Sequence, residues 1–238
     1  MSLLKLPLLA TVAWGIHTTM TAPNPPPTVE ERLPPTGIEH LVPVVPSTSK
    51  VLFWTASLAE MATIIANHLP THTLSQHILR LLVRTPPSTA SNLRTTFPFL
   101  LGWSLALAGA LLRRHCYRTL DTKFTFELSI RKDHRLVTHG PYAYVRHPSY
   151  TGALIAGAGT LMCLLAPGSW LRECSGLWRW DASGTSVVLG VFVAGAAVAR
   201  RALAGRMRRE DEMLRARFGE EWERWAMKVP WRLVPGLY

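Results

Sequence analysis

Side chains able to bind a charged ligand gather in one run that leads into an apolar stretch. The run reads His134-Arg-Leu-Val-Thr-His-Gly-Pro-Tyr142-Ala-Tyr144-Val-Arg146-His147-Pro148-Ser149-Tyr150-Thr-Gly152. Proline suits the first turn of a helix, so the run predicts a helix that starts at Pro148 with free backbone N–H groups. Such a helix end attracts anionic or acceptor-rich ligands. His147 alone would suggest a structural residue, whereas the cluster favours a binding site.

A second charged group lies on a predicted tail helix. At about 100° per residue, an arc of roughly 60° holds the apolar stripe Leu203, Met207, Leu214 and Phe218. Arg206 and Glu210 lie at the edge of this stripe, whereas three residues point away: Arg208, Glu212 and Arg215. An exposed i,i+4 ion pair is the simple interpretation. If the helix continues from a membrane span, charges held near the bundle favour a functional site.

The elements that must position these residues are apolar stretches near the roughly 17 to 25 residues of a membrane-spanning helix. The five stretches are Leu3 to Met20, Val51 to Leu69, Phe97 to Leu112, Tyr150 to Pro167 and Thr185 to Ala199. A signal peptide is the alternative for the first, but no Ala-x-Ala cleavage site follows it. The last two are rich in Gly and Ala, so we expect both to pack within the bundle. The fold class is therefore all-α, an integral membrane helical bundle of about five transmembrane helices with a cytosolic C-terminal helix.

Charge is separated from these stretches. The chain of 238 residues has a net charge of +11. Residues 113–147 hold eight basic and three acidic residues, and residues 200–238 hold ten and six. The positive-inside rule places both segments in the cytosol. Basic residues there also attract anionic lipid, and no nucleic-acid-binding motif accompanies them, so we expect the bilayer and no nucleic acid as a partner.

Other features of the sequence narrow its organisation. A mean hydropathy of +0.13 excludes a disordered chain. Three cysteines without a CxxC pair exclude a disulfide framework or a four-cysteine zinc site, and no metal is expected. Eight prolines between Pro23 and Pro46 predict a tether with no packed core and no chemistry. We expect three parts: an N-terminal span and linker (1–50), a second span and loop (51–96), and a catalytic core (97–238).

Two motifs together resemble the isoprenylcysteine carboxyl methyltransferase family. The first runs from Leu136 to Gly152, and the second, from Arg206, is Arg-x-x-x-Glu-Asp-Glu-x-Leu-x-x-x-Phe-Gly-Glu-Glu-Trp. The resemblance covers about Phe97 to Tyr238. Phospholipid methyltransferases and some sterol reductases are similar in the His-Pro-x-Tyr part alone. This chain departs from the family at Trp222 and Trp225, where tyrosines are usual, and we expect little consequence because both are interfacial aromatic residues.

The resemblance implies a multi-pass enzyme of the endoplasmic reticulum membrane with its active site facing the cytosol. It would transfer a methyl group from S-adenosyl-L-methionine to the C-terminal carboxylate of prenylated cysteine proteins. Carried over by position, Arg206 would be the catalytic, substrate-binding residue and Glu210 would meet the cofactor. The other cofactor-binding residues would be His134, Arg135 (through its backbone), Leu136, Val137, Tyr142, His147, Pro148, Ser149 and Tyr150.

The chemistry agrees with this resemblance. A C-terminal carboxylate, with a pKa of about 3.3 to 3.7, is already ionised at neutral pH, so no general base is needed. Arg206 can hold it with two parallel donors. Three alternatives stay open. A phospholipid N-methyltransferase would place a neutral amine beside Arg206, which is unfavourable. A membrane sterol reductase would need more spans and more basic groups for NADPH, and a non-catalytic membrane scaffold would leave the paired motifs unexplained.

Overall fold

The computed structural model describes residues 3–34, 40, 44–129, 135–177 and 182–237. It is all-helical, as predicted; within the described residues β-pairing is limited to one isolated bridge between Arg32 and Ser129. The helices are α1 (Lys5–Thr19), α2 (Val45–His68), α3 (Thr73–Leu82), α4 (Phe97–Leu120), α5 (Pro148–Leu165), α6 (Trp170–Glu173), α7 (Ala182–Phe218) and α8 (Glu220–Lys228). Short 3-10 turns occupy Pro87–Asn92, Asp121–Lys123 and Gly140–Ala143.

Each of the five apolar stretches forms at least part of a helix, so the prediction that they are helical is confirmed. Among the described residues, α5 is the one helix that is long and apolar enough to cross a membrane, with a mean hydropathy of 1.3. Helix α1 has 15 residues, fewer than the roughly 20 that a bilayer needs. Crossing of the membrane therefore stays a prediction for all five. The last predicted span and the tail helix form one helix, α7, of 37 residues.

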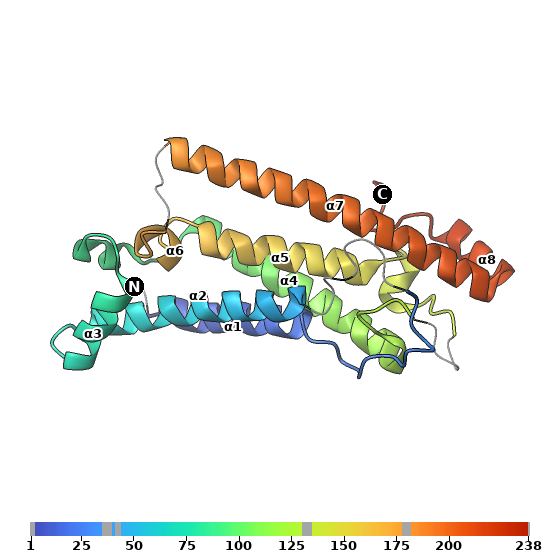
Figure 1. The fold of residues 1–238 in the computed structure, drawn as a ribbon, viewed down its shortest axis with the longest axis horizontal. Coiled ribbons are helices and arrows are strands. Elements are labelled where there is room, and N and C mark those ends of the chain that lie inside the picture. Colours follow the sequence, from blue (N-terminus) through green and yellow to red (C-terminus); the bar gives the residue numbers. More distant parts are fainter. Residues whose placement is uncertain (1–2, 35–39, 41–43, 130–134, 178–181, 238) are drawn as a thin grey trace.

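Helices α4 and α5 lie side by side through small residues (Figure 1). A Cβ atom added to Gly109 would lie 2.3 Å from the backbone nitrogen of Ala156, and one added to Gly159 would lie 2.3 Å from that of Ala106. Both distances are far below van der Waals contact, so only glycine permits this approach. The predicted close packing of the fourth span is confirmed.

The same prediction is wrong for α7 at the positions that the structure describes. A Cβ atom at Gly190 or Gly195 would meet nothing within 4 Å, and Val198 is 63% exposed. In Figure 1 the N-terminal half of α7 runs apart from α4 and α5. The physical reason is that α7 is held through polar contacts of its C-terminal half, described below, and not through its small residues.

Two ends of the bundle can be distinguished. At one end, a buried ion pair joins α1 to α2, with 2.5 Å between Lys5 Nζ and Glu60 Oε1. Lys5 also donates to the carbonyl of Gly168, which lies just after α5. At the opposite end, the C-terminal end of α4, the start of α5 and helix α8 come together (Figure 1). The basic loop and the basic tail thus share one end of the bundle, which is the arrangement that the positive-inside rule requires.

The proline-rich segment has contacts that the sequence did not predict. Asn24 donates to the carbonyls of Asp121 and Phe124, at 2.7 and 3.0 Å. Arg32 forms an ion pair with Glu127, with Nε and Oε2 2.7 Å apart. The expectation of a tether without packing is therefore wrong for the part up to residue 34, because its few polar side chains bind the loop after α4.

Candidate functional site

A cavity of about 330 Å³ lies where α4, α5, α7 and α8 meet the loop after α4. Apolar side chains form much of its wall: Met20, Val45, Leu120, Phe124, Phe126, Leu128, Leu136, Val137, Met213, Leu214 and Trp225. Charged and polar groups form the rest, among them Arg113, Arg135, Tyr142, Arg146, His147, Ser149, Tyr150, Arg206 and Glu210. A volume of this size suits a small molecule.

Helix α5 begins as predicted, with Pro148 in its first turn. Several backbone N–H groups around this N-terminus already have hydrogen-bond partners. The backbone nitrogens of Arg146 and His147 donate to the carbonyls of Trp231 and Arg232, at 2.9 and 2.8 Å. The nitrogen of Tyr150 donates to the carbonyl of His147. The chain after α8 thus folds back and pairs with the loop before α5, so fewer N–H groups are free here than predicted, and an anion site at this helix end stays a prediction.

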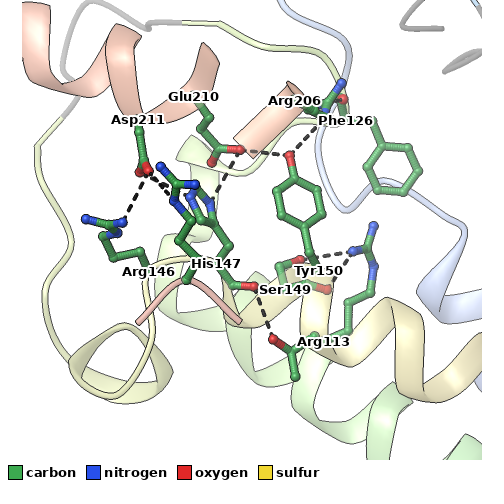
Figure 2. Close-up of polar contacts among 11 residues, drawn as sticks. Arg113, Phe126, Arg146, His147, Ser149, Tyr150, Arg206, Glu210 and Asp211 are labelled. Atoms are coloured by element: carbon green, nitrogen blue, oxygen red, sulfur yellow. Dashed lines mark hydrogen bonds and ion pairs between the residues drawn. The ribbon is translucent and has the colours of Figure 1, made fainter. Parts of the chain in front are cut away.

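The hydroxyl of Tyr150 connects the two charged residues of the tail motif (Figure 2). It accepts a hydrogen bond from Arg206 Nε at 2.7 Å and donates one to Glu210 Oε2 at 2.7 Å. Arg206 Nη2 also donates to the carbonyl of Phe126. The two tail residues are thus linked through α5 and not as a solvated surface pair, and both side chains are fixed at the cavity wall.

Asp211, which the sequence analysis did not select, joins three parts of the site. Its Oδ1 accepts from His147 Nε2 at 3.1 Å, and its Oδ2 lies 3.5 Å from Arg146 Nη2 and 3.3 Å from Arg232 Nε. Burial opposes ionisation, but the hydrogen bond from His147 and the nearby positive charges outweigh it, so the pKa of Asp211 is lowered. The sequence could have indicated Asp211 by its position on the predicted helix, because it lies about 20° from Phe218, at the edge of the apolar stripe.

Arg113 is a second residue that the sequence analysis did not select. The residue is 8% exposed, and its guanidinium donates from Nη1 to the carbonyl and hydroxyl of Ser149, at 2.9 and 3.1 Å. Its Nε donates to the carbonyl of Thr19 at 2.9 Å and to the Tyr117 hydroxyl at 2.7 Å. Ser149, predicted to contact the cofactor, therefore already has a partner within the protein. No local pattern marks Arg113, since its contacts come from three separate helices.

The structure brings most of the predicted site residues to one cavity. Its wall includes Arg135, Leu136, Val137, Tyr142, His147, Ser149, Tyr150, Arg206 and Glu210. Pro148 is buried and not part of the wall, and His134 lies outside the described residues. Burial raises the pKa of the Tyr142 hydroxyl well above its usual value, so it is a neutral group here.

The two tryptophans that depart from the resemblance lie beside the site. Trp225 is buried and its indole N–H donates to the carbonyl of Tyr142 at 3.2 Å. The Trp222 ring stacks against the guanidinium of Arg146 at 5.7 Å. A tyrosine at position 225 would lack the indole N–H of the first contact. Trp225 therefore forms part of the cavity wall and Trp222 packs beside it, beyond the interfacial role expected for them.

The arrangement can bind a ligand with charges of both signs. The Glu210 carboxylate suits a cationic amino group, the guanidiniums of Arg206 and Arg113 suit a carboxylate, and the apolar wall suits a ring or a hydrocarbon chain. Within the described residues, no three His, Cys, Asp or Glu side chains are grouped so that they could hold a metal ion.

Comparison with known families covers the middle of this chain. Residues 101–173 match the model of the isoprenylcysteine carboxyl methyltransferase (ICMT) family. The matched range contains most of α4, all of α5 and the loop between them, which carries the first motif. The resemblance that the motifs indicate is confirmed for this part of the chain.

Several relatives carry the corresponding name. Protein-S-isoprenylcysteine O-methyltransferase B of Arabidopsis thaliana is 31% identical over 131 residues, which cover 54% of this chain and 55% of the relative. The probable protein-S-isoprenylcysteine O-methyltransferase of Oryza sativa subsp. indica is 30% identical over 54% of this chain and 57% of its own. The protein-S-isoprenylcysteine O-methyltransferase of Tribolium castaneum is 38% identical over 69 residues, which cover 28% of this chain and 25% of the relative. The chain thus spans about half the length of the first two relatives.

Proposed function

We propose that this chain, which matches the isoprenylcysteine carboxyl methyltransferase family over residues 101–173, methylates the C-terminal carboxylate of prenylated cysteine proteins. The observation that supports this most directly is the link from Arg206 through the Tyr150 hydroxyl to Glu210. It sets a carboxylate-binding cation and a cation-binding carboxylate at one cavity, with a single neutral hydroxyl between them. This pair of charges suits a methyl transfer from a cationic donor to an anionic acceptor.

The residues of the cavity fit S-adenosyl-L-methionine by their chemistry. Glu210, 29% exposed, offers a carboxylate to an amino-acid ammonium group. Leu136, Val137 and Trp225 offer apolar and aromatic surface to a purine ring. When bound, this cofactor supplies an electrophilic methyl group. The hydrogen bonds from His147 to Asp211 and from Tyr150 to Glu210 keep the proposed cofactor side of the cavity in one geometry.

On the acceptor side, Arg206 would orient a carboxylate oxygen. The Phe126 carbonyl and the Tyr150 hydroxyl fix the guanidinium, so its orientation does not have to be established when the substrate arrives. Because the acceptor is already ionised at neutral pH, the protein supplies alignment and exclusion of water. A prenyl chain requires an apolar route, which agrees with the expected location in the endoplasmic reticulum membrane and a cavity that faces the cytosol.

The experiment that tests the function measures transfer of labelled methyl from S-adenosyl-L-methionine to N-acetyl-S-farnesylcysteine by membranes that carry the chain. We expect a base-labile ester, which distinguishes a carboxyl ester from an N-methyl group. The carboxamide of the same compound is the control and should accept no methyl. Transfer to a phosphatidylethanolamine headgroup, and none to the prenylcysteine, would contradict the proposal and favour the phospholipid N-methyltransferase.

The pH profile provides a separate prediction. Since the acceptor carboxylate has a pKa of about 3.3 to 3.7, activity at saturating cofactor should show no acidic limb between about pH 6 and 8. An amine acceptor loses its lone pair on protonation, so its rate would rise roughly tenfold per pH unit in that range. Initial rates across this range, with chemistry rate-limiting, separate the two acceptor classes.

A further inference from the structure

Arg113 is a buried cation without an anionic partner in the part of the chain that the structure describes. Its four hydrogen bonds go to neutral oxygens, two carbonyls and two hydroxyls: Thr19 O, Tyr117 OH, Ser149 O and Ser149 Oγ. A guanidinium stays charged at any relevant pH. A buried charge is costly unless an opposite charge accompanies it. This position therefore favours the binding of an anion.

The position of Arg113 shows where that anion would lie. Arg113 lines the same cavity as Arg206, and its guanidinium carbon lies 5.4 Å from the centre of the Phe126 ring. The carbonyl of the same Phe126 accepts from Arg206. In Figure 2 the guanidinium of Arg113 points toward Phe126, with Arg206 beyond it. Its Nη2 forms no hydrogen bond with the described residues.

Tyr150 separates this cationic side from the acidic side of the cavity. Figure 2 shows Glu210, His147 and Asp211 on one side of the Tyr150 ring, and Phe126 with the two arginines on the other. The acidic side suits the ammonium group of the cofactor. The cationic side is left for a carboxylate.

We infer that Arg113 supplies, together with Arg206, the positive charge that holds a carboxylate in this cavity, and that this carboxylate is the acceptor's. The inference rests on the proposed function. Methylation converts the acceptor into a neutral ester, so the attraction to two guanidiniums is lost in the product. The two charges thus favour the acid over its ester and aid product release.

The test compares an acid with its amide within one variant. The full chain in lipid nanodiscs, with S-adenosylhomocysteine present, is titrated with N-acetyl-S-farnesylcysteine and with its carboxamide. In the wild type the acid should bind more tightly than the amide. In Arg113→Met this preference should fall about 10- to 100-fold, the range expected for a lost charge-assisted contact. Arg113→Lys, which keeps the charge, should retain part of it.

A matched control lies at the next residue of α4. Arg114 is exposed, so Arg114→Met removes the same charge from the same helix and should leave the preference unchanged. Tyr117→Phe removes one hydrogen bond of Arg113 and keeps its charge, and it should also leave the preference unchanged. Because the readout is a ratio within one preparation, a lower folded fraction does not change it.

Two further outcomes are informative. If Arg113→Met instead abolishes the preference for S-adenosylmethionine over its decarboxylated analogue, the charge serves the cofactor's carboxylate and the assignment to the acceptor is overturned. If neither preference changes, Arg113 only ties α1, α4 and α5 together and the inference fails. A wild-type chain that binds acid and amide equally would count against the proposed function itself.

Discussion

At the scale of single residues, Arg206 has its geometry fixed by two partners, the Tyr150 hydroxyl and the Phe126 carbonyl. Lysine keeps the charge but replaces a planar fork by a single ammonium point. We expect Arg206→Lys to lower turnover on the order of 10²-fold, the cost of misplacing a reacting group by about 1 Å. Cofactor affinity, measured by calorimetry, should stay near the wild-type value. Unchanged turnover would remove the role assigned to Arg206.

A second prediction at this scale concerns Glu210, on the acidic side of the cavity. Its carboxylate accepts from Tyr150 and is assigned to the cofactor's ammonium group. Glu210→Gln removes the negative charge and keeps the shape, so S-adenosylmethionine binding should weaken by about 1 to 3 kcal/mol. Glu212→Gln, two residues further along α7 and exposed, is the matched control and should leave the affinity as it is. Equal affinities in the two variants would make Glu210 an ordinary surface residue.

At the scale of elements, the contact between α4 and α5 places the site, because Arg113 on α4 meets Ser149 at the start of α5. Gly109→Ala would force a Cβ to within 2.3 Å of the Ala156 backbone, so the helices must separate. We expect a loss of about 1 to 3 kcal/mol in stability, the usual cost of overpacking. Thermal unfolding in detergent, followed by circular dichroism, measures it.

The control for this prediction is on α5 itself. A Cβ added at Gly157 meets nothing within 4 Å, so Gly157→Ala should leave the melting temperature unchanged or raise it slightly. A loss of stability equal to that of Gly109→Ala would show that glycine content, and not the close approach, decides the effect.

At the scale of the whole molecule, Asp211 connects the long helix α7, the start of α5 and the segment after α8. Its pKa in the folded chain lies below the ordinary value of 3.8. Ionised Asp211 therefore stabilises the fold above about pH 4, and this contribution is lost as the pH falls through the lowered pKa.

The corresponding variant is Asp211→Asn. Near pH 6 it should be less stable than the wild type by about 1.5 to 3 kcal/mol, the value of hydrogen bonds to a charged group. The difference should shrink as the pH falls below 3.8, because the carboxylate of the unfolded chain is protonated there first and that of the folded chain only at its lower pKa. Melting temperatures of both proteins between pH 3 and 6 measure this, and a difference that stays constant with pH would contradict the assigned charge.

Sequence alone predicted the helices and part of the site, because those features follow from local pattern. Apolar stretches predicted all five long helices, Pro148 fixed the start of α5, and the 100° spacing placed Arg208, Glu212 and Arg215 on the exposed face. The pairing of two motifs indicated the family. Each of these signals is contained in a few consecutive residues or in residues one or two turns apart.

Tertiary structure decided which groups are partners. Tyr150 bonds Glu210 across 60 positions, His147 bonds Asp211 across 64, and Arg113 bonds the carbonyl of Thr19 across 94. The fold-back after α8, which pairs with Arg146 and His147, is equally distant in sequence. Hydrogen bonds of this kind depend on the angle and register at which packed helices meet, and no local periodicity encodes these. The charges were therefore visible in the sequence, but their division into an acidic and a cationic side of one cavity was not.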